Sequence, residues 1–273
     1  MFSRKVLSIA VAALGLTVSA HAAPKRYLVQ FKSEATFQAM SQRLSSVTPF
    51  NAVEGSEVRL FGSNAAVKET LPNIKMIVVE SEDAMTIESL RAHPAIGLVE
   101  EEYFHPAPEP IATRGASLAA VGIRAKKKAM DVPWGITAVK APQAWKVTRG
   151  TSARVLVLDT GADQSHPALA GRIEAVRNFT GGAATDVSDQ VGHGSHVSGT
   201  ILANGAAGGL VGVAPEAREL VGKVCTEQGC SSIAIAQGLD WAVSQHVDVV
   251  NMSLGGPFMS QGEATAVQNA ENS

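Results

Sequence analysis

The chain lacks several features that would otherwise narrow its function. It has two cysteines in 273 residues, too few for a disulfide scaffold or, alone, for a structural zinc site. Its formal charge of −2 gives no electrostatic case for a nucleic-acid partner. Its longest apolar stretch, Val6–Val18, is shorter than the ~20 residues that a membrane-spanning helix needs. What is present, 45% hydrophobic and 18% charged residues, is the composition of a globular protein.

The first 22 residues have the pattern of a secretory signal peptide. Arg4 and Lys5 supply a positive start, the apolar stretch follows, and Ala20-His21-Ala22 is a small-x-small cleavage pattern. We therefore expect residues 1–22 to direct export, to the extracellular space or the periplasm. Disulfides can form in such a compartment.

Residues 23–105 alternate between strand and helix patterns. The sequence predicts strands over 27–31, 58–61, 76–79 and from 97 onward, and helices over 34–44 and 85–93. This order, βαββαβ, predicts a small α+β unit of the ferredoxin type.

A linker is expected over residues 106–130. Pro106, Pro108 and Pro110 break regular structure, and Arg124 with Lys126–Lys128 forms a basic cluster. The segment is either a solvated surface linker or a protease-sensitive connector. We favour the connector, because nicking concentrates in exposed segments of this kind.

Residues 131–273 have the sequence pattern of a parallel α/β protein. Continuous apolar runs over 155–158, 220–224 and 247–252 are typical of strands buried on both faces. Helical patterns over 196–202 and 233–243 lie between them. Strands that alternate with helices predict a parallel sheet with crossover connections.

Two residues in this region are candidates for chemistry. Asp159 closes an apolar strand, where open α/β sheets bind ligands, although a strand-end aspartate can also simply cap a turn. His193 lies in Gly192-His193-Gly194-Ser195-His196, at the expected start of a helix. It could act as a general base held by a buried aspartate, with His196 pointing into the core. Alternatively, the two histidines bind a metal or are unrelated surface residues, but no further ligand stands at a diagnostic spacing.

Several motifs together resemble the subtilisin family of serine peptidases. The matching runs are Val157–Asp163 around the triad aspartate, Gly192–Thr200 around the triad histidine, Val211–Pro215, Asn251–Pro257, and Trp134–Trp145 at the start of the mature enzyme. The order, aspartate before histidine, is also that of the family. The resemblance implies an α/β fold in which residues 131–273 are the N-terminal half of a doubly wound parallel sheet. It also implies that residues 23–105 are an inhibitory propeptide.

The resemblance implies roles for further residues. Ser253, Leu254 and Gly255 would form a backbone edge that pairs with a peptide substrate, and the loop 227–231 would supply the opposing edge. The expected partners are therefore peptide or protein substrates, and the chain's own propeptide with its C-terminal tail in the substrate groove.

The family's serine motif, Gly-Thr-Ser-Met-Ala-Ser-Pro, does not occur in the 273 residues. Neither Ser195, next to the base on its own helix, nor Ser253, on the substrate edge, is a plausible substitute, because nucleophile and base must be within hydrogen-bond reach. We expect a chain truncated before the catalytic serine, and inactive as written. The whole would be a serine endopeptidase zymogen.

The resemblance also bears on metals. Many relatives bind calcium through an aspartate whose matching position here is Ala168, and through an asparagine whose loop here is Ala206–Gly209. Because calcium prefers several oxygen ligands, we expect this site to be lost and no other cofactor to be needed. A calcium site elsewhere in a longer protein stays open.

Cys225 and Cys230 are close enough in sequence for a local disulfide, which an oxidising compartment favours. Two free thiols, or a bond to a cysteine outside the sequence, are the alternatives. Two other functions also stay open: a non-catalytic product that acts through its propeptide as an inhibitor or folding helper, and a metal-dependent hydrolase built on Asp159, His193 and His196.

Overall fold

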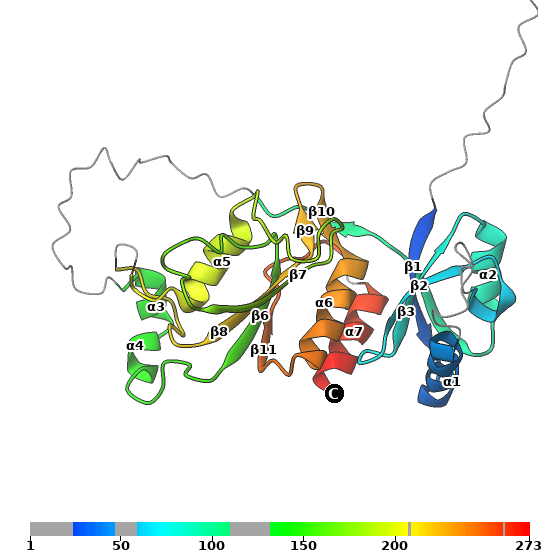
Figure 1. Ribbon diagram of the computed structural model, residues 1–273, viewed down its shortest axis with the longest axis horizontal. Helices are drawn as coiled ribbons and strands as arrows, with labels where there is room; N and C mark the ends of the chain where they lie inside the picture. The colour runs from blue at the N-terminus through cyan, green and yellow to red at the C-terminus, as the bar shows by residue number, and fades with distance from the viewer. Residues whose placement is uncertain (1–23, 47–58, 110–131, 207–208, 259) are drawn as a thin grey trace, which may run out of the picture.

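The computed structural model describes residues 24–46, 59–109, 132–206, 209–258 and 260–273. The predicted signal peptide and most of the predicted linker, including its basic cluster, lie outside these residues. Within them, two sheets stand on either side of a central pair of helices (Figure 1). No helix in these ranges is long and apolar enough to cross a bilayer.

The N-terminal unit is an antiparallel sheet with two helices. Its elements are β1 (Lys25–Phe31), α1 (Glu34–Ser46), β2 (Ala66–Leu71), β3 (Met76–Ser81), α2 (Ala84–Ala92) and β4 (Ile96–Glu101), with the strand order β2-β3-β1-β4. This is the βαββαβ arrangement that the sequence predicts.

One strand of this unit was predicted in the wrong place. Leu60–Gly62 is a short 3-10 turn, in which Phe61 has φ 52° and is left-handed rather than extended. The strand follows at Ala66–Leu71, where polar side chains interrupt the apolar pattern. β2 lies at the edge of the sheet, so it does not need two apolar faces.

The C-terminal unit is built on a parallel sheet with the order β11-β6-β8-β7. Its strands are β6 (Arg154–Asp159), β7 (Ile173–Asn178), β8 (Arg218–Lys223) and β11 (Val249–Asn251), and its helices are α3 (Trp134–Ala138), α4 (Ala141–Ala144), α5 (His193–Leu202), α6 (Ser232–Ser244) and α7 (Gln261–Glu271). Residues 155–158 and 220–222 are buried in β6 and β8, as expected for a central pair. The run over 247–252 is not buried on both faces as predicted, because it contains the edge strand β11, in which Val249 is 53% exposed. β7 was not predicted, because it is an edge strand with only partly buried residues.

The two units share a core. Along β1, Val29 faces α1 and α2, whereas Leu28 joins a cluster with Ile235 of α6 and Ala266 of α7. This alternation follows from the period of two in a strand. Helices α6 and α7 therefore lie between the two sheets (Figure 1).

Acidic side chains from the end of the N-terminal sheet reach the first turns of both helices. Ser231 caps α6 and donates its hydroxyl to Glu102, while Ser260 caps α7 and donates to Glu100. Glu100 also accepts from the backbone N–H of Gly262 at 3.2 Å. Negative charge is stabilising at a helix N-terminus, so these contacts fix how the two units dock.

Candidate active site

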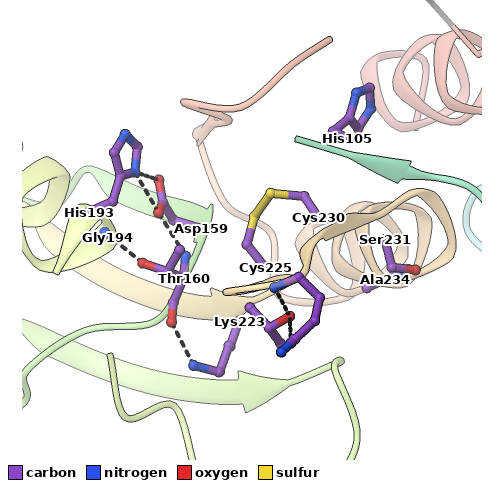
Figure 2. The surroundings of a disulfide bond; sticks show 12 residues. His105, Asp159, Thr160, His193, Gly194, Lys223, Cys225, Cys230, Ser231 and Ala234 are labelled. Carbon is purple, nitrogen blue, oxygen red and sulfur yellow. Dashed lines mark hydrogen bonds and ion pairs between the residues drawn. A yellow bond between two sulfur atoms is a disulfide. The ribbon is translucent and has the colours of Figure 1, made fainter. Parts of the chain in front are cut away.

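Asp159 and His193 come together at the carboxyl end of the parallel sheet. Strand β6 ends at Asp159 and helix α5 begins at His193, which places the imidazole Nδ1 2.8 Å from Asp159 Oδ1 and 3.0 Å from Oδ2 (Figure 2). An ionised carboxylate only accepts hydrogen bonds, so Nδ1 carries the proton. In the neutral ring, Nε2 is then the basic nitrogen.

The surroundings hold this pair in a fixed geometry. Asp159 is 1% exposed and accepts a 2.7 Å hydrogen bond from the backbone N–H of Thr160, whereas the His193 side chain is 22% exposed. Helix α5 can approach this closely because residue 194 is glycine: a Cβ there would lie 2.1 Å from the carbonyl oxygen of Gly161. The pair therefore has a buried acid and a base that solvent or a ligand can reach.

His196 does not lie in the core, contrary to the sequence prediction. It is exposed on α5, because the face of the helix that meets the sheet is taken by Gly194, Ser198 and Leu202 at spacings of four. In the part of the chain that the structure describes, no group of three or more histidine, cysteine or acidic side chains forms a metal-binding cluster.

Asp189 is a positioning residue that sequence reasoning missed. Its Oδ1 accepts from the Thr160 hydroxyl at 2.8 Å and from the Gly192 N–H at 2.8 Å, and its Oδ2 accepts from the Ser195 N–H at 2.8 Å and hydroxyl at 2.6 Å. Burial raises the pKa of this carboxyl, but the hydrogen bonds outweigh it and the net shift is downward. The sequence does hold one signal for this role: Asp189 stands three residues before Gly192-His193, where a helix begins.

We expect Asp189→Ala to loosen the start of α5. The N-cap, Gly192, has no side chain, so the substitution leaves the Ser195 N–H of the first turn without an acceptor, at a cost of about 2 kcal/mol. Amide hydrogen exchange of that turn should therefore accelerate by roughly 30-fold. Asp186→Ala is the matched control, because Asp186 accepts from the Ser188 N–H and hydroxyl within its own loop. An equal acceleration of α5 in both variants would contradict the role assigned to Asp189.

Two predicted substrate edges flank the segment that follows β4. Strand β5 (Phe104–His105) pairs antiparallel with β10 (Gly229–Ser231), which lies at the end of the predicted loop 227–231. Further along, Pro106–Pro108 share one cavity with His193 and with Ser253, Leu254 and Gly255. The structure thus brings both edges and the base around one extended segment of the same chain.

Cys225 and Cys230 are bonded to each other. The disulfide joins β9 (Cys225–Thr226) to β10, with 3.9 Å between the two Cα atoms, and both cysteines are buried. In Figure 2 it lies between the Asp159–His193 pair and His105. The β9–β10 hairpin, which carries one of the two predicted substrate edges, is therefore cross-linked at its base.

Comparisons with known proteins find similarity to bacterial proteases. The major intracellular serine protease of Bacillus subtilis (strain 168) is 47% identical over 146 residues, which cover 51% of this chain and 46% of that protein. Subtilisin E of the same strain is 29% identical over 91% of this chain and 56% of its own length. The alkaline protease of Alkalihalobacillus alcalophilus is 31% identical over 92% of this chain and 59% of its own length. The chain thus spans about half the length of the curated relatives it matches.

The match to a known family lies in the unit that carries Asp159 and His193. The sequence profile that matches here is described as the Subtilase family, and it covers residues 150–273. These residues also contain β6, α5 and the 253–255 edge. Over residues 150–273 this chain is therefore similar to subtilisin-like serine peptidases of the subtilase family.

Proposed function

We propose that this chain is the N-terminal part of a secreted serine endopeptidase zymogen. The observation that carries the proposal is the hydrogen-bonded pair of buried Asp159 and accessible His193 beside the 253–255 edge. The nucleophilic serine would come from a segment outside these 273 residues. Export is supported by the signal-like residues 1–22 and by the Cys225–Cys230 disulfide, which an oxidising compartment would maintain.

The proposed chemistry follows from the side chains of Asp159 and His193. His193 Nε2 takes the proton from the serine hydroxyl as that oxygen attacks the scissile carbonyl, and later gives it to the leaving amine. Asp159 keeps the imidazole in the required tautomer and stabilises its protonated form, because its carboxylate faces Nδ1. Water then hydrolyses the acyl-enzyme by the same proton transfers in reverse.

Residues 24–109 act as the inhibitor of this groove. Their tail adds a strand to β10 and continues past His193, where a substrate would lie. Asn73 and Ile74 of the same unit donate backbone N–H groups to Asp240 on α6, at 2.7 and 3.2 Å. Apolar packing and these polar bonds together favour a docked inhibitor rather than a free one.

Calcium is not expected at the position that relatives use. Ala168 is buried and has no side-chain oxygen, its N–H donates to His166 Nδ1 at 3.2 Å, and its carbonyl accepts from Asn204 N–H at 3.0 Å. A hard cation would find no carboxylate at this residue. The proposed peptidase therefore uses no metal there.

The chain as written should not sustain peptide hydrolysis. The purified 273-residue protein is incubated with casein, and peptide release is followed over several hours. Without a nucleophile, His193 has no group to activate, so we expect release at the level of the buffer control. Sustained release that disappears in the His193→Ala variant would contradict the absence of a nucleophile.

A further inference from the structure

The side chain of His105 lies in a slot between Gly256 and Glu263, next to strand β10. The ring is 6% exposed, and Nε2 lies 2.8 Å from Oε1 and 3.0 Å from Oε2 of Glu263, on the first turn of α7. It also lies 2.9 Å from the hydroxyl of Tyr103. Sequence reasoning did not select Glu263, because it stands 158 residues from His105.

The slot fits both the backbone and the ring of this residue. His105 lies opposite Cys230 in the β5–β10 pair, and a Cβ on Gly229 would meet the His105 carbonyl oxygen at 2.4 Å. A Cβ on Gly256 would meet ring Nδ1 at 2.9 Å. Two glycines therefore leave room for a strand on β10 whose side chain at this position points toward α7.

The polar groups in the slot favour a nitrogen donor. Burial, together with the Glu263 carboxylate, raises the pKa of Tyr103 well above its usual range, so its phenol stays protonated and donates to Glu263. Nε2 thus faces a carboxylate and a phenol oxygen, and it must carry a proton to satisfy them. The cavity around Glu263 is otherwise lined mainly by apolar side chains, among them Ile235, Leu254 and Val267, with Gln268 and Glu271 farther along α7.

A side chain without a donor would leave Glu263 poorly satisfied. Its side chain is only 12% exposed, and an unpaired buried carboxylate costs more free energy than a paired one contributes. When a substrate strand replaces the tail, Tyr103 leaves with it, and the incoming side chain must supply the partner. An apolar side chain of similar size fills the space but not the hydrogen bond.

We infer that this slot is a specificity pocket, which selects a substrate with histidine or lysine at the position that His105 occupies in the tail. The inference rests on the proposed function, because it assumes that a substrate adds to β10 as the tail does. Glu263 would accept the hydrogen bond from the substrate side chain, and Gly229 and Gly256 would set the width of the slot.

The test measures docking of the tail in the full 273-residue chain, without hydrolysis. Amide hydrogen exchange of the β5–β10 pair reports how firmly the tail is held. We expect His105→Leu to lower protection by at least about tenfold, and His105→Lys by less than about threefold, because lysine still offers N–H donors to Glu263. Leucine protected as well as histidine and lysine would overturn the inference.

A second set of variants changes the pocket rather than the tail. In the Glu263→Leu background the order should reverse, so that His105→Leu is better protected than His105→Lys. Glu82→Leu, which removes an exposed carboxylate of the N-terminal unit outside this cavity, should leave the original order unchanged. An unchanged order in Glu263→Leu would also overturn the inference. If that variant does not fold, the His105 series in the native pocket decides alone.

These results are separable from the proposed activity. Tail protection depends on the slot and not on a nucleophile, so a reversed order with Glu263→Leu would stand even if the full-length protein proved inactive. Conversely, an active peptidase that holds leucine and lysine equally at residue 105 would refute the pocket and leave the activity intact.

Discussion

Replacing His193 with alanine is expected to lower peptide hydrolysis by the proposed longer peptidase on the order of 10⁴-fold or more. The variant loses the nitrogen that takes and returns the proton, while the buried Asp159 loses its imidazole partner and keeps the Thr160 N–H. Residual activity would come only from substrate binding and from transition-state stabilisation elsewhere. The measurement is kcat/KM on a peptide substrate at neutral pH.

His196→Ala is the matched control for this experiment. His196 lies on the same helix, three residues later, and is exposed. Its removal should change kcat/KM by less than about twofold, since surface substitutions away from the reacting groups have small effects. Comparable losses in the two variants would show that α5 as a whole, or a metal shared by both rings, is responsible. They would refute His193 as a base acting alone with Asp159.

Glu219→Gln is expected to change how stability depends on pH. Glu219, on β8, is fully buried; Oε1 accepts a hydrogen bond from the Ser198 hydroxyl, and Oε2 has no partner in the described residues. Burial raises the pKa of this carboxyl from 4.5 to about 7, and the Ser198 hydrogen bond opposes the shift only in part. The folded protein therefore prefers the neutral acid.

The sign of the effect follows from linkage. Below pH 4.5 the carboxyl is protonated in both states, and its contribution to stability is fully present. Between pH 4.5 and about 7 the unfolded chain releases the proton first, so stability falls by about 3 kcal/mol and then levels off. Glutamine cannot ionise, so the variant should lack this fall and exceed the wild type above pH 7.

The measurement is urea unfolding of wild type and variant at pH 4, 6 and 8. Glu216→Gln is the control: Glu216 is only partly buried, and its pKa is lowered first by the Thr151 hydroxyl and then by Arg149. That variant should keep the wild-type fall between pH 4.5 and 7. If the free energy of unfolding of Glu219→Gln depends on pH in the same way as that of the wild type, the inference that Glu219 is buried as a neutral acid is wrong.

The sequence by itself determined the fold class and the two residues of the Asp159–His193 pair. A continuous apolar run is what a strand buried on both faces needs, so β6 and β8 could be recognised from local composition. Asp159 ends such a run and His193 opens a glycine-flanked helix, and both features are local. The family comparison over residues 150–273 agrees with this part of the prediction.

Only the tertiary structure decided the contacts between distant segments. Edge strands such as β7 need just one apolar face, so their pattern is weak, and the exposure of His196 depends on which face of α5 meets the sheet. The burial of Glu219 and the pairing of His105 with Glu263 arise when elements far apart in the chain pack together. Local periodicity carries no information about such pairs, because their energy depends on the partner and on the removal of water, which docking alone provides.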